Sequence, residues 1–161
     1  MAITVLGQSI CPLCGKKMYE SEEIYSFPPF VQNTKDPYYY FNDTAFHKNC
    51  LSENQLGNSA IKFSNEFISK TNPKNRICSV GKNPIRKVDD YIFIDLLTSD
   101  ENEQLFKFNF TTLDVNNLGK WRDREDFLKL AINFQKSGKW KDLSKFKYLD
   151  NLIQRISESN S

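Results

Sequence analysis

The feature that most constrains this chain is a set of four side chains that carry sulfur or imidazole groups. Two cysteines stand three positions apart near the start, and the only histidine stands three positions before another cysteine. These residues are Cys11, Cys14, His47 and Cys50. Three thiolates and one imidazole form a ligand set of tetrahedral zinc sites, and two intervening residues let a pair of thiolates face one ion. The sequence therefore predicts that these distant residues converge on one Zn²⁺ ion.

The cysteines could instead form two disulfides in a secreted chain. Against that alternative, the first residues lack the basic and apolar segments of a secretory signal, and no apolar run has the length of a membrane span. A reducing cytosol keeps thiols available for metal. We therefore expect a cytoplasmic protein with metal-bound cysteines and no membrane association. The remaining cysteine, Cys78, is expected to be a buried strand residue.

The segments around the four candidate ligands predict a knuckle, a hairpin and a helix. Gly15 follows the second cysteine and permits the positive φ that such a turn needs. Residues 24–27 and 38–41 are rich in aromatic side chains and predict two strands. Asp43 or Thr44 is expected to cap a helix that carries His47 and Cys50 one turn apart. The loop at 30–36 is either a recognition surface or, as we favour, part of the packing around the metal site.

This order of knuckle, hairpin and helix-borne ligand pair resembles the treble-clef class of zinc fingers. The CxxC and HxxC ligand set also resembles one half of a LIM domain. The resemblance covers residues 8–58 and implies a small module organised by a structural zinc ion.

The rest of the chain predicts an α+β fold with a boundary near Thr71-Asn72-Pro73. Residues 1–72 are expected to form the zinc-binding module, and 73–161 an antiparallel hairpin plus two helices, packed together with the first module as one compact unit. Residues 91–97 are strongly apolar, and Phe106, Phe108 and Phe110 alternate with polar residues, so both stretches predict strands. No internal repeat is apparent.

The inventory of reactive residues argues against an enzyme. Structural zinc sites are closed by four protein ligands, whereas catalytic ones keep a position for water. The predicted site uses the only histidine, so no imidazole is left as a general base or to activate Cys78. Glycine-rich phosphate loops are absent. Adjacent carboxylates such as Asp89-Asp90 are more often a solvated surface than an acid–base pair, so carboxylate catalysis is the weakest alternative.

Charge patterning offers two candidate binding surfaces, although the net charge is only +2. Positions 70–87 hold basic residues and no acidic one: Lys70, Lys74, Arg76, Lys82, Arg86 and Lys87. Positions 89–103 hold acidic residues and no basic one, among them Asp100, Glu101 and Glu103 in the connection at 99–103. The basic stretch suits phosphates, and the acidic one suits a basic site on a protein. A solvated face explains either stretch as well.

The sequence thus favours a non-catalytic, zinc-stabilised module that binds a protein partner. An immunity or antitoxin-like role, with a toxin as the partner, is a narrower form of this hypothesis. The alternative is a nucleic-acid-binding protein that uses the basic stretch.

Overall fold

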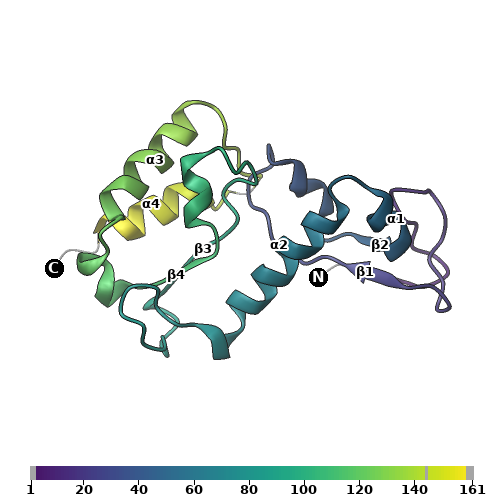
Figure 1. Cartoon of the computed structure of the whole chain (residues 1–161), viewed down its shortest axis with the longest axis horizontal. Helices are drawn as coiled ribbons and strands as arrows, with labels where there is room; N and C mark the ends of the chain where they lie inside the picture. The colour runs from purple at the N-terminus through teal and green to yellow at the C-terminus, as the bar shows by residue number, and fades with distance from the viewer. Residues whose placement is uncertain (1–2, 144, 159–161) are drawn as a thin grey trace.

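The computed structural model describes residues 3–143 and 145–158 and confirms the α+β class. Short strands form two separate antiparallel hairpins, and helices follow each of them (Figure 1). The strands are β1 (Ile24–Ser26), β2 (Ala45–His47), β3 (Tyr91–Ile94) and β4 (Thr111–Asp114). The α-helices are α1 (Lys48–Glu53), α2 (Gly57–Thr71), α3 (Arg124–Lys136) and α4 (Tyr148–Glu158). The 3-10 helices are η1 (Pro37–Phe41), η2 (Pro73–Asn75), η3 (Gln104–Phe108) and η4 (Val115–Lys120).

Helix α2 connects the two ends of an elongated molecule. Figure 1 places the first hairpin and α1 at one end, the second hairpin with α3 and α4 at the other, and α2 between them. The ring of Phe63 on α2 lies 5.1 Å from that of Tyr38 in the first half and 6.3 Å from that of Phe110 in the second. No helix in the described parts of the chain is both long and apolar enough to cross a membrane.

Two hydrophobic cores stabilise the two ends. The first is mainly aromatic and is built from the rings of Phe27, Phe30, Phe41 and Phe46. The second lies between the β3–β4 hairpin, α3 and α4, and includes Leu113, Phe127, Leu149 and Ile156. The apolar spacing over 121–134 and 143–156 predicts two C-terminal helices, and α3 and α4 bury apolar residues from Phe127 and from Leu149 onward. Leu143 and Phe146 precede α4 and are exposed, so the second helix begins later than that spacing predicts.

The loop at 30–36 contributes to the first core, where packing around the metal site was expected, and it also packs against the second half. Phe30, Val31 and Asn33 are buried. The Asn33 side chain donates to the carbonyl of Lys139 and accepts from the backbone N–H of Lys141. Its partners are thus in the C-terminal half rather than around the metal cluster alone.

Two predicted strands are 3-10 helices, and the prediction was wrong for both. The tyrosines at 38–40 lie in η1, because the Asp36 carboxylate accepts from the Tyr38 N–H at 3.0 Å and Pro37 starts the helix. Most of the stretch at 105–110 lies in η3, and β3 pairs with 111–114 instead. Phenylalanine alternation indicated burial correctly for Phe108 and Phe110 but not the backbone conformation.

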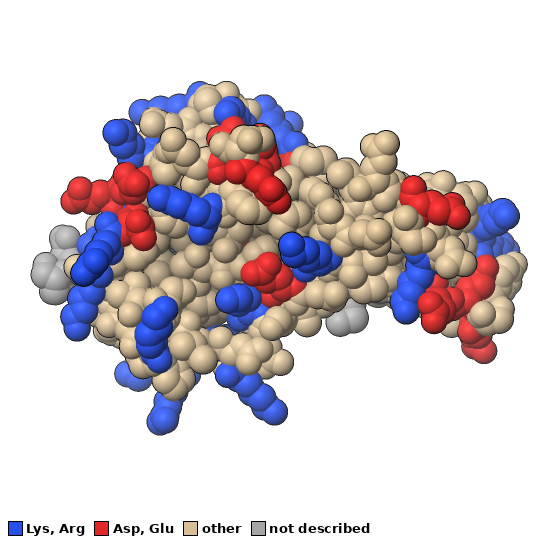
Figure 2. Space-filling view, viewed as in Figure 1, with Lys and Arg blue, Asp and Glu red and all other residues tan. Residues whose placement is uncertain are grey.

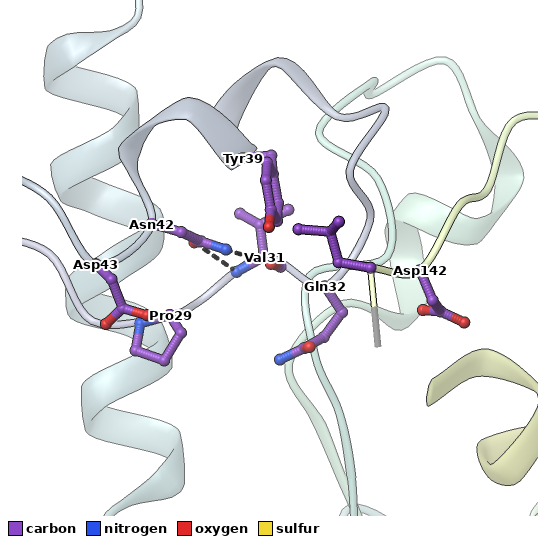
Figure 3. Close-up of a pocket in the computed structure, with 8 residues that line it drawn as sticks. Pro29, Val31, Gln32, Tyr39, Asn42, Asp43 and Asp142 are labelled. Atoms are coloured by element: carbon purple, nitrogen blue, oxygen red, sulfur yellow. Dashed lines mark hydrogen bonds between the residues drawn. The ribbon is translucent and has the colours of Figure 1, made fainter. Parts of the chain in front are cut away.

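An asparagine closes the connection inside each hairpin. The Asn42 side chain accepts from the N–H groups of Phe30 and Val31 and donates to the carbonyl of Val31, as Figure 3 shows for Val31. Asn109 accepts from the N–H of Leu97 at 2.8 Å and donates to the carbonyl of Thr98 at 2.7 Å. The residue after each asparagine has a positive φ, which turns the chain into β2 or β4.

The elements of the first half recur in the second, and most start 67 positions later; β2 and β4 start 66 positions apart but end 67 apart, at His47 and Asp114. The starts correspond as Ile24 and Tyr91 for β1 and β3, Pro37 and Gln104 for η1 and η3, Lys48 and Val115 for α1 and η4, and Gly57 and Arg124 for α2 and α3. The hairpins also share a register, because Ile24 pairs with His47 and Tyr91 with Asp114. The expectation of no internal repeat is therefore wrong at the level of structure.

Candidate metal centre

The knuckle that carries the first two cysteines is a tight, hydrogen-bonded turn. The Cys11 N–H donates to the carbonyl of Lys16 at 2.9 Å, and the Gly15 N–H donates to the carbonyl of Cys11 at 2.8 Å. Gly15 has a φ of 70°, the left-handed conformation expected from its place after Cys14. The turn folds back through an isolated bridge between Ile10 and Lys17. Its geometry lets the two cysteine side chains face the same space.

The other two candidate ligands stand at the junction of β2 and α1. His47 is the last residue of β2, and Cys50 lies in the first turn of α1, which begins at Lys48. The predicted cap at Asp43 or Thr44 was therefore wrong, because His47 occupies the N-cap position without a side-chain cap. The Lys48 N–H donates to the carbonyl of Glu23 at 2.8 Å and fixes the start of α1 against the hairpin.

The structure brings the four candidate donors together. The ligand atoms of Cys11, Cys14, His47 and Cys50 all lie within 4.8 Å of one another. The Nδ1 atom of His47 lies 3.3 Å from the Cys14 sulfur and 3.7 Å from the Cys50 sulfur. Three sulfurs and one ring nitrogen around a common point are compatible with a bound Zn²⁺ ion.

A carboxylate holds the histidine ring from the opposite side. The Nε2 atom of His47 lies 3.2 Å from Oε2 of Glu22, which also accepts from the Tyr19 N–H at 2.8 Å. A metal-ligating histidine typically donates its other ring N–H to such a group, which fixes the tautomer. The ring is thus oriented with Nδ1 towards the thiols and Nε2 towards Glu22, which suits metal ligation by Nδ1 with Nε2–H as the donor to the carboxylate. Sequence reasoning missed Glu22, because only the hairpin fold brings it next to His47.

The thiols have different environments, so they do not ionise alike without a cation. Burial opposes ionisation of Cys11, but backbone N–H groups of His47, Cys14 and Leu13 outweigh it and lower its pKa to about 7. Burial raises the pKa of Cys50 to about 12, and the neighbouring Cys14 and Cys11 sulfurs add to this effect. One negative charge is readily placed in the cluster, and further charges repel it. A cation removes this repulsion, so the arrangement favours metal binding.

Two residues of the predicted acidic surface make contacts within the chain. Asp100 and Glu101 are exposed, whereas Glu103 is half-buried and pairs with Lys139. The Asp100 carboxylate accepts from the backbone and side-chain N–H groups of Asn102, which lowers the pKa of Asp100. Of Asp100, Glu101 and Glu103, only Glu101 has no hydrogen bond or ion pair that the structure describes.

The predicted basic stretch lies on the surface after α2. Lys70, Lys74, Lys82, Arg86 and Lys87 are exposed. Arg76 is half-buried, and its guanidinium lies over the ring of Tyr91 at 4.4 Å. Figure 2 shows basic side chains along the lower edge of this face, below the end of α2, and further basic side chains along its upper edge.

Cys78 is buried, as predicted, but it lies in a second turn rather than in a strand. Its sulfur is within hydrogen-bond distance of the N–H groups of Gly81, at 3.3 Å, and Asp114, at 3.4 Å. Cys78 thus stands at the start of a turn, as Cys11 does in the first knuckle.

No protein-family model, curated protein or solved structure matches the chain. The Cys/His cluster therefore suggests a zinc site without identifying a family.

Proposed function

We propose that the chain is a non-catalytic, zinc-stabilised protein-binding module, and that its first 72 residues form a treble-clef-like zinc finger. The observation that carries this proposal is the arrangement of the four donors, since three sulfurs and Nδ1 of His47 provide four protein ligands for one ion. A site closed in this way has no position for a reacting water. Cys11, Cys14, His47 and Cys50 would hold the ion, which would supply folding energy rather than a reactive group.

Apolar surface next to the cluster supports a role in binding proteins. The segment before the knuckle exposes Ile3, Val5, Leu6 and Ile10, with 92%, 46%, 42% and 56% of each residue accessible. Apolar side chains exposed along one short segment favour contact with another protein. Exposed carboxylates at 100 and 101 lie in the other half and would favour a basic partner. An inhibitor of a basic toxin, as in an immunity protein, is the narrower form of this proposal.

A capture experiment with the full chain tests the proposal. The tagged protein is incubated with extracts of its own cells, with and without nuclease, and bound proteins are identified by mass spectrometry. Two matched variants remove charge from one surface each, Asp100→Asn with Glu101→Gln, and Lys82→Gln with Arg86→Gln. We expect a protein that survives nuclease treatment and is lost with the acidic-surface variant alone. Capture of nucleic acid only would contradict the proposal, and a protein that both variants retain equally would contradict the role of the acidic surface.

The exposed basic stretch favours one alternative, a nucleic-acid-binding protein. Phosphate contacts by several lysines and arginines give an affinity that falls steeply with salt. Fluorescence anisotropy with labelled DNA and RNA separates the two functions. The alternative predicts binding at low salt that the Lys82→Gln, Arg86→Gln variant weakens, and absence of binding at low salt would remove it.

A further inference from the structure

The repeat extends to the individual backbone hydrogen bonds of the two knuckles. The N–H of Cys11 donates to the carbonyl of Lys16, and that of Cys78 to the carbonyl of Asn83, each at 2.9 Å. The N–H of Gly15 donates to Cys11 at 2.8 Å, and that of Lys82 to Cys78 at 2.9 Å. Lys82 adopts a φ of 56°, matching the left-handed Gly15, although lysine lacks the freedom of glycine. The second knuckle therefore has the backbone of the first.

The same correspondence holds where β4 leads into η4. The N–H of Lys48 donates to Glu23 at 2.8 Å, and the N–H of Val115 donates to Asp90 at 2.9 Å. Identical residues recur at the shared spacing, namely Ile10 and Ile77, Cys11 and Cys78, Phe41 and Phe108, Asn42 and Asn109, Thr44 and Thr111, Asn49 and Asn116, Leu51 and Leu118, Lys62 and Lys129, and Phe67 and Phe134. Knuckle, hairpin register and helix start together fix which residues of the second half stand at the four ligand positions.

Those positions hold Cys78, Gly81, Asp114 and Asn117 in the second half. Burial agrees at each of them. Cys11 and Cys78 are both fully buried, and His47 and Asp114 are 8% and 7% exposed. Cys14 and Gly81 are both exposed, and Cys50 and Asn117 are both half-buried. One thiol of the ligand set is thus retained, and the other three ligands are replaced.

A hydrogen-bonded cluster occupies the space that the ligands surround in the first half. The Asn117 side-chain amide lies 3.8 Å from the Cys78 sulfur and 3.3 Å from the Asn83 side-chain oxygen. The Asn83 amide in turn donates to the Asp114 carboxylate at 3.4 Å. A Cβ atom built on Gly81 would lie 2.3 Å from the Asn83 oxygen and 2.7 Å from the Asn117 amide nitrogen. A side chain at position 81 would therefore point into this cluster, as the position of a ligand requires.

We propose that residues 76–136 are a second copy of the metal module, formed by residues 9–71, and that its hydrogen-bonded cluster is a latent zinc site. Direct hydrogen bonds among Cys78, Asn83, Asp114 and Asn117 replace the ion, so the second copy folds without metal. The backbone still presents four positions with the geometry of the Cys/His cluster. Restoring the side chains of the first copy at those positions restores zinc binding.

The test replaces the cluster with the residues of the first copy. The variant carries Gly81→Cys, Asn83→Lys, Asp114→His and Asn117→Cys, and Asn83 is changed because its side chain would collide with a cysteine at 81. The matched control carries the same new residue types one place away, Lys82→Cys and Asn116→Cys, with Asn83→Lys and Asp114→His. Zinc is measured by elemental analysis, and Co²⁺ substitution reports thiolate ligation by its charge-transfer absorption.

We expect two zinc ions per chain in the variant, one in the control and one in the unaltered protein. The Co²⁺ thiolate absorption per chain should approximately double in the variant alone. A folded variant that holds one ion, or a control that holds two, would overturn the proposal.

A single substitution tests the same placement without rebuilding the site. Asn117→Cys puts a thiol next to Cys78, whereas Asn116→Cys, the control, puts one on an exposed residue whose side chain is directed to Asp114. Diamide takes two electrons and two protons from a pair of close thiols and becomes a hydrazine as the disulfide forms. Peptide mapping should find a disulfide between positions 78 and 117 in the variant. Its absence, or an equal yield from position 116, would contradict the placement.

Discussion

The two halves of this molecule have the same knuckle, hairpin and helix, but they hold the centre of that unit together in different ways. In the first half three sulfurs and an imidazole meet at a point that suits Zn²⁺. In the second half a buried thiol, two amides and a carboxylate bond to one another. The comparison indicates that a knuckle and hairpin of this shape can form around hydrogen-bonded side chains as well as around metal ligands. This backbone needs a polar group at the centre that satisfies the knuckle and the start of the helix.

The second half also has support that the first lacks. Helix α4 has no counterpart in the repeat, and it covers the second core through Leu149, Leu152 and Ile156. A hydrogen bond contributes about 1 kcal/mol, whereas a structural zinc ion contributes roughly 10 kcal/mol or more in small fingers. Apolar burial by α4 is thus a source of stability that belongs to the second half.

The largest expected effect is the response of the two halves to loss of zinc. Cys14→Ser should remove the ion and expose residues 8–58 to solvent exchange, because the metal contribution is on the order of 10 kcal/mol. The amides of β3, β4 and α3 should stay protected, since their core is built without the ion. Hydrogen exchange followed by mass spectrometry measures both halves in one sample. Equal loss of protection in the two halves would break the comparison.

A buried carboxylate makes the stability of the second half depend on pH, and the equivalent residue of the first half cannot titrate. Asp95 corresponds to Pro28, and burial raises the pKa of Asp95 to about 7 despite hydrogen bonds from Gln32 and Tyr148. Because the folded-state pKa is above the ordinary value of 3.8, the folded state binds the proton more tightly. Stability is therefore highest below pH 4 with respect to this group, and it falls as the pH rises towards 7.

Asp95→Asn isolates this contribution. The free energy of unfolding of the variant minus that of the unaltered protein should increase between pH 4 and pH 7.5, by on the order of 4 kcal/mol at most. Urea unfolding at matched pH values measures it, and the subtraction removes the pH dependence of zinc binding. A difference that stays constant with pH would show that the Asp95 carboxylate titrates normally.

Matched alanine substitutions at the retained cysteine sharpen the contrast between the halves. Cys78→Ala removes the acceptor of the Gly81 and Asp114 N–H groups and should cost about 2 kcal/mol without changing zinc content. Cys11→Ala at the equivalent position should abolish stoichiometric zinc binding. Zinc analysis and chemical denaturation of both variants provide the measurement. Loss of zinc from the Cys78→Ala protein would mean that the two centres are not independent.

The smallest expected effect concerns the carboxylate that orients His47. Glu22→Gln should weaken zinc binding about tenfold, because the ring loses an anionic partner for Nε2–H. Glu23→Gln is the control, since Glu23 pairs with Lys48 on the surface and not with the ligand ring. Competition with a chromophoric chelator gives the affinities. Equal affinities for the two variants would assign no role to the Glu22 contact.

The sequence predicts the candidate metal centre well because ligand spacing is a short-range signal. Cys11 and Cys14 are placed by one turn, and His47 and Cys50 by one helix start, so only one long-range contact must be inferred. Glu22 was missed because its role depends on the register of the hairpin. The α+β class and the presence of two C-terminal helices also follow from apolar periodicity, although α4 begins at Tyr148, later than the apolar set from Leu143 predicts.

The conformation of the aromatic segments could not be predicted in the same way. Tyrosines and phenylalanines favour strands, but the Asp36 side chain caps the start of η1. Asn42 and Asn109, at the ends of η1 and η3, bond back to the residues that follow β1 and β3. The repeat is hard to recognise in the sequence because three of the four ligand positions hold different residues in the two copies. The shared Phe-Asn and the Ile-Cys pair, at one constant spacing, are the signals that identify it.

X-ray absorption at the zinc edge of the purified, unaltered protein tests the central claim most directly. We expect one zinc ion per chain with three sulfur neighbours at about 2.3 Å and one nitrogen neighbour at about 2.0 Å. Such a shell leaves no position for water. Absence of zinc, or a shell that includes a solvent oxygen, would contradict a closed structural centre and would reopen the case for a catalytic one.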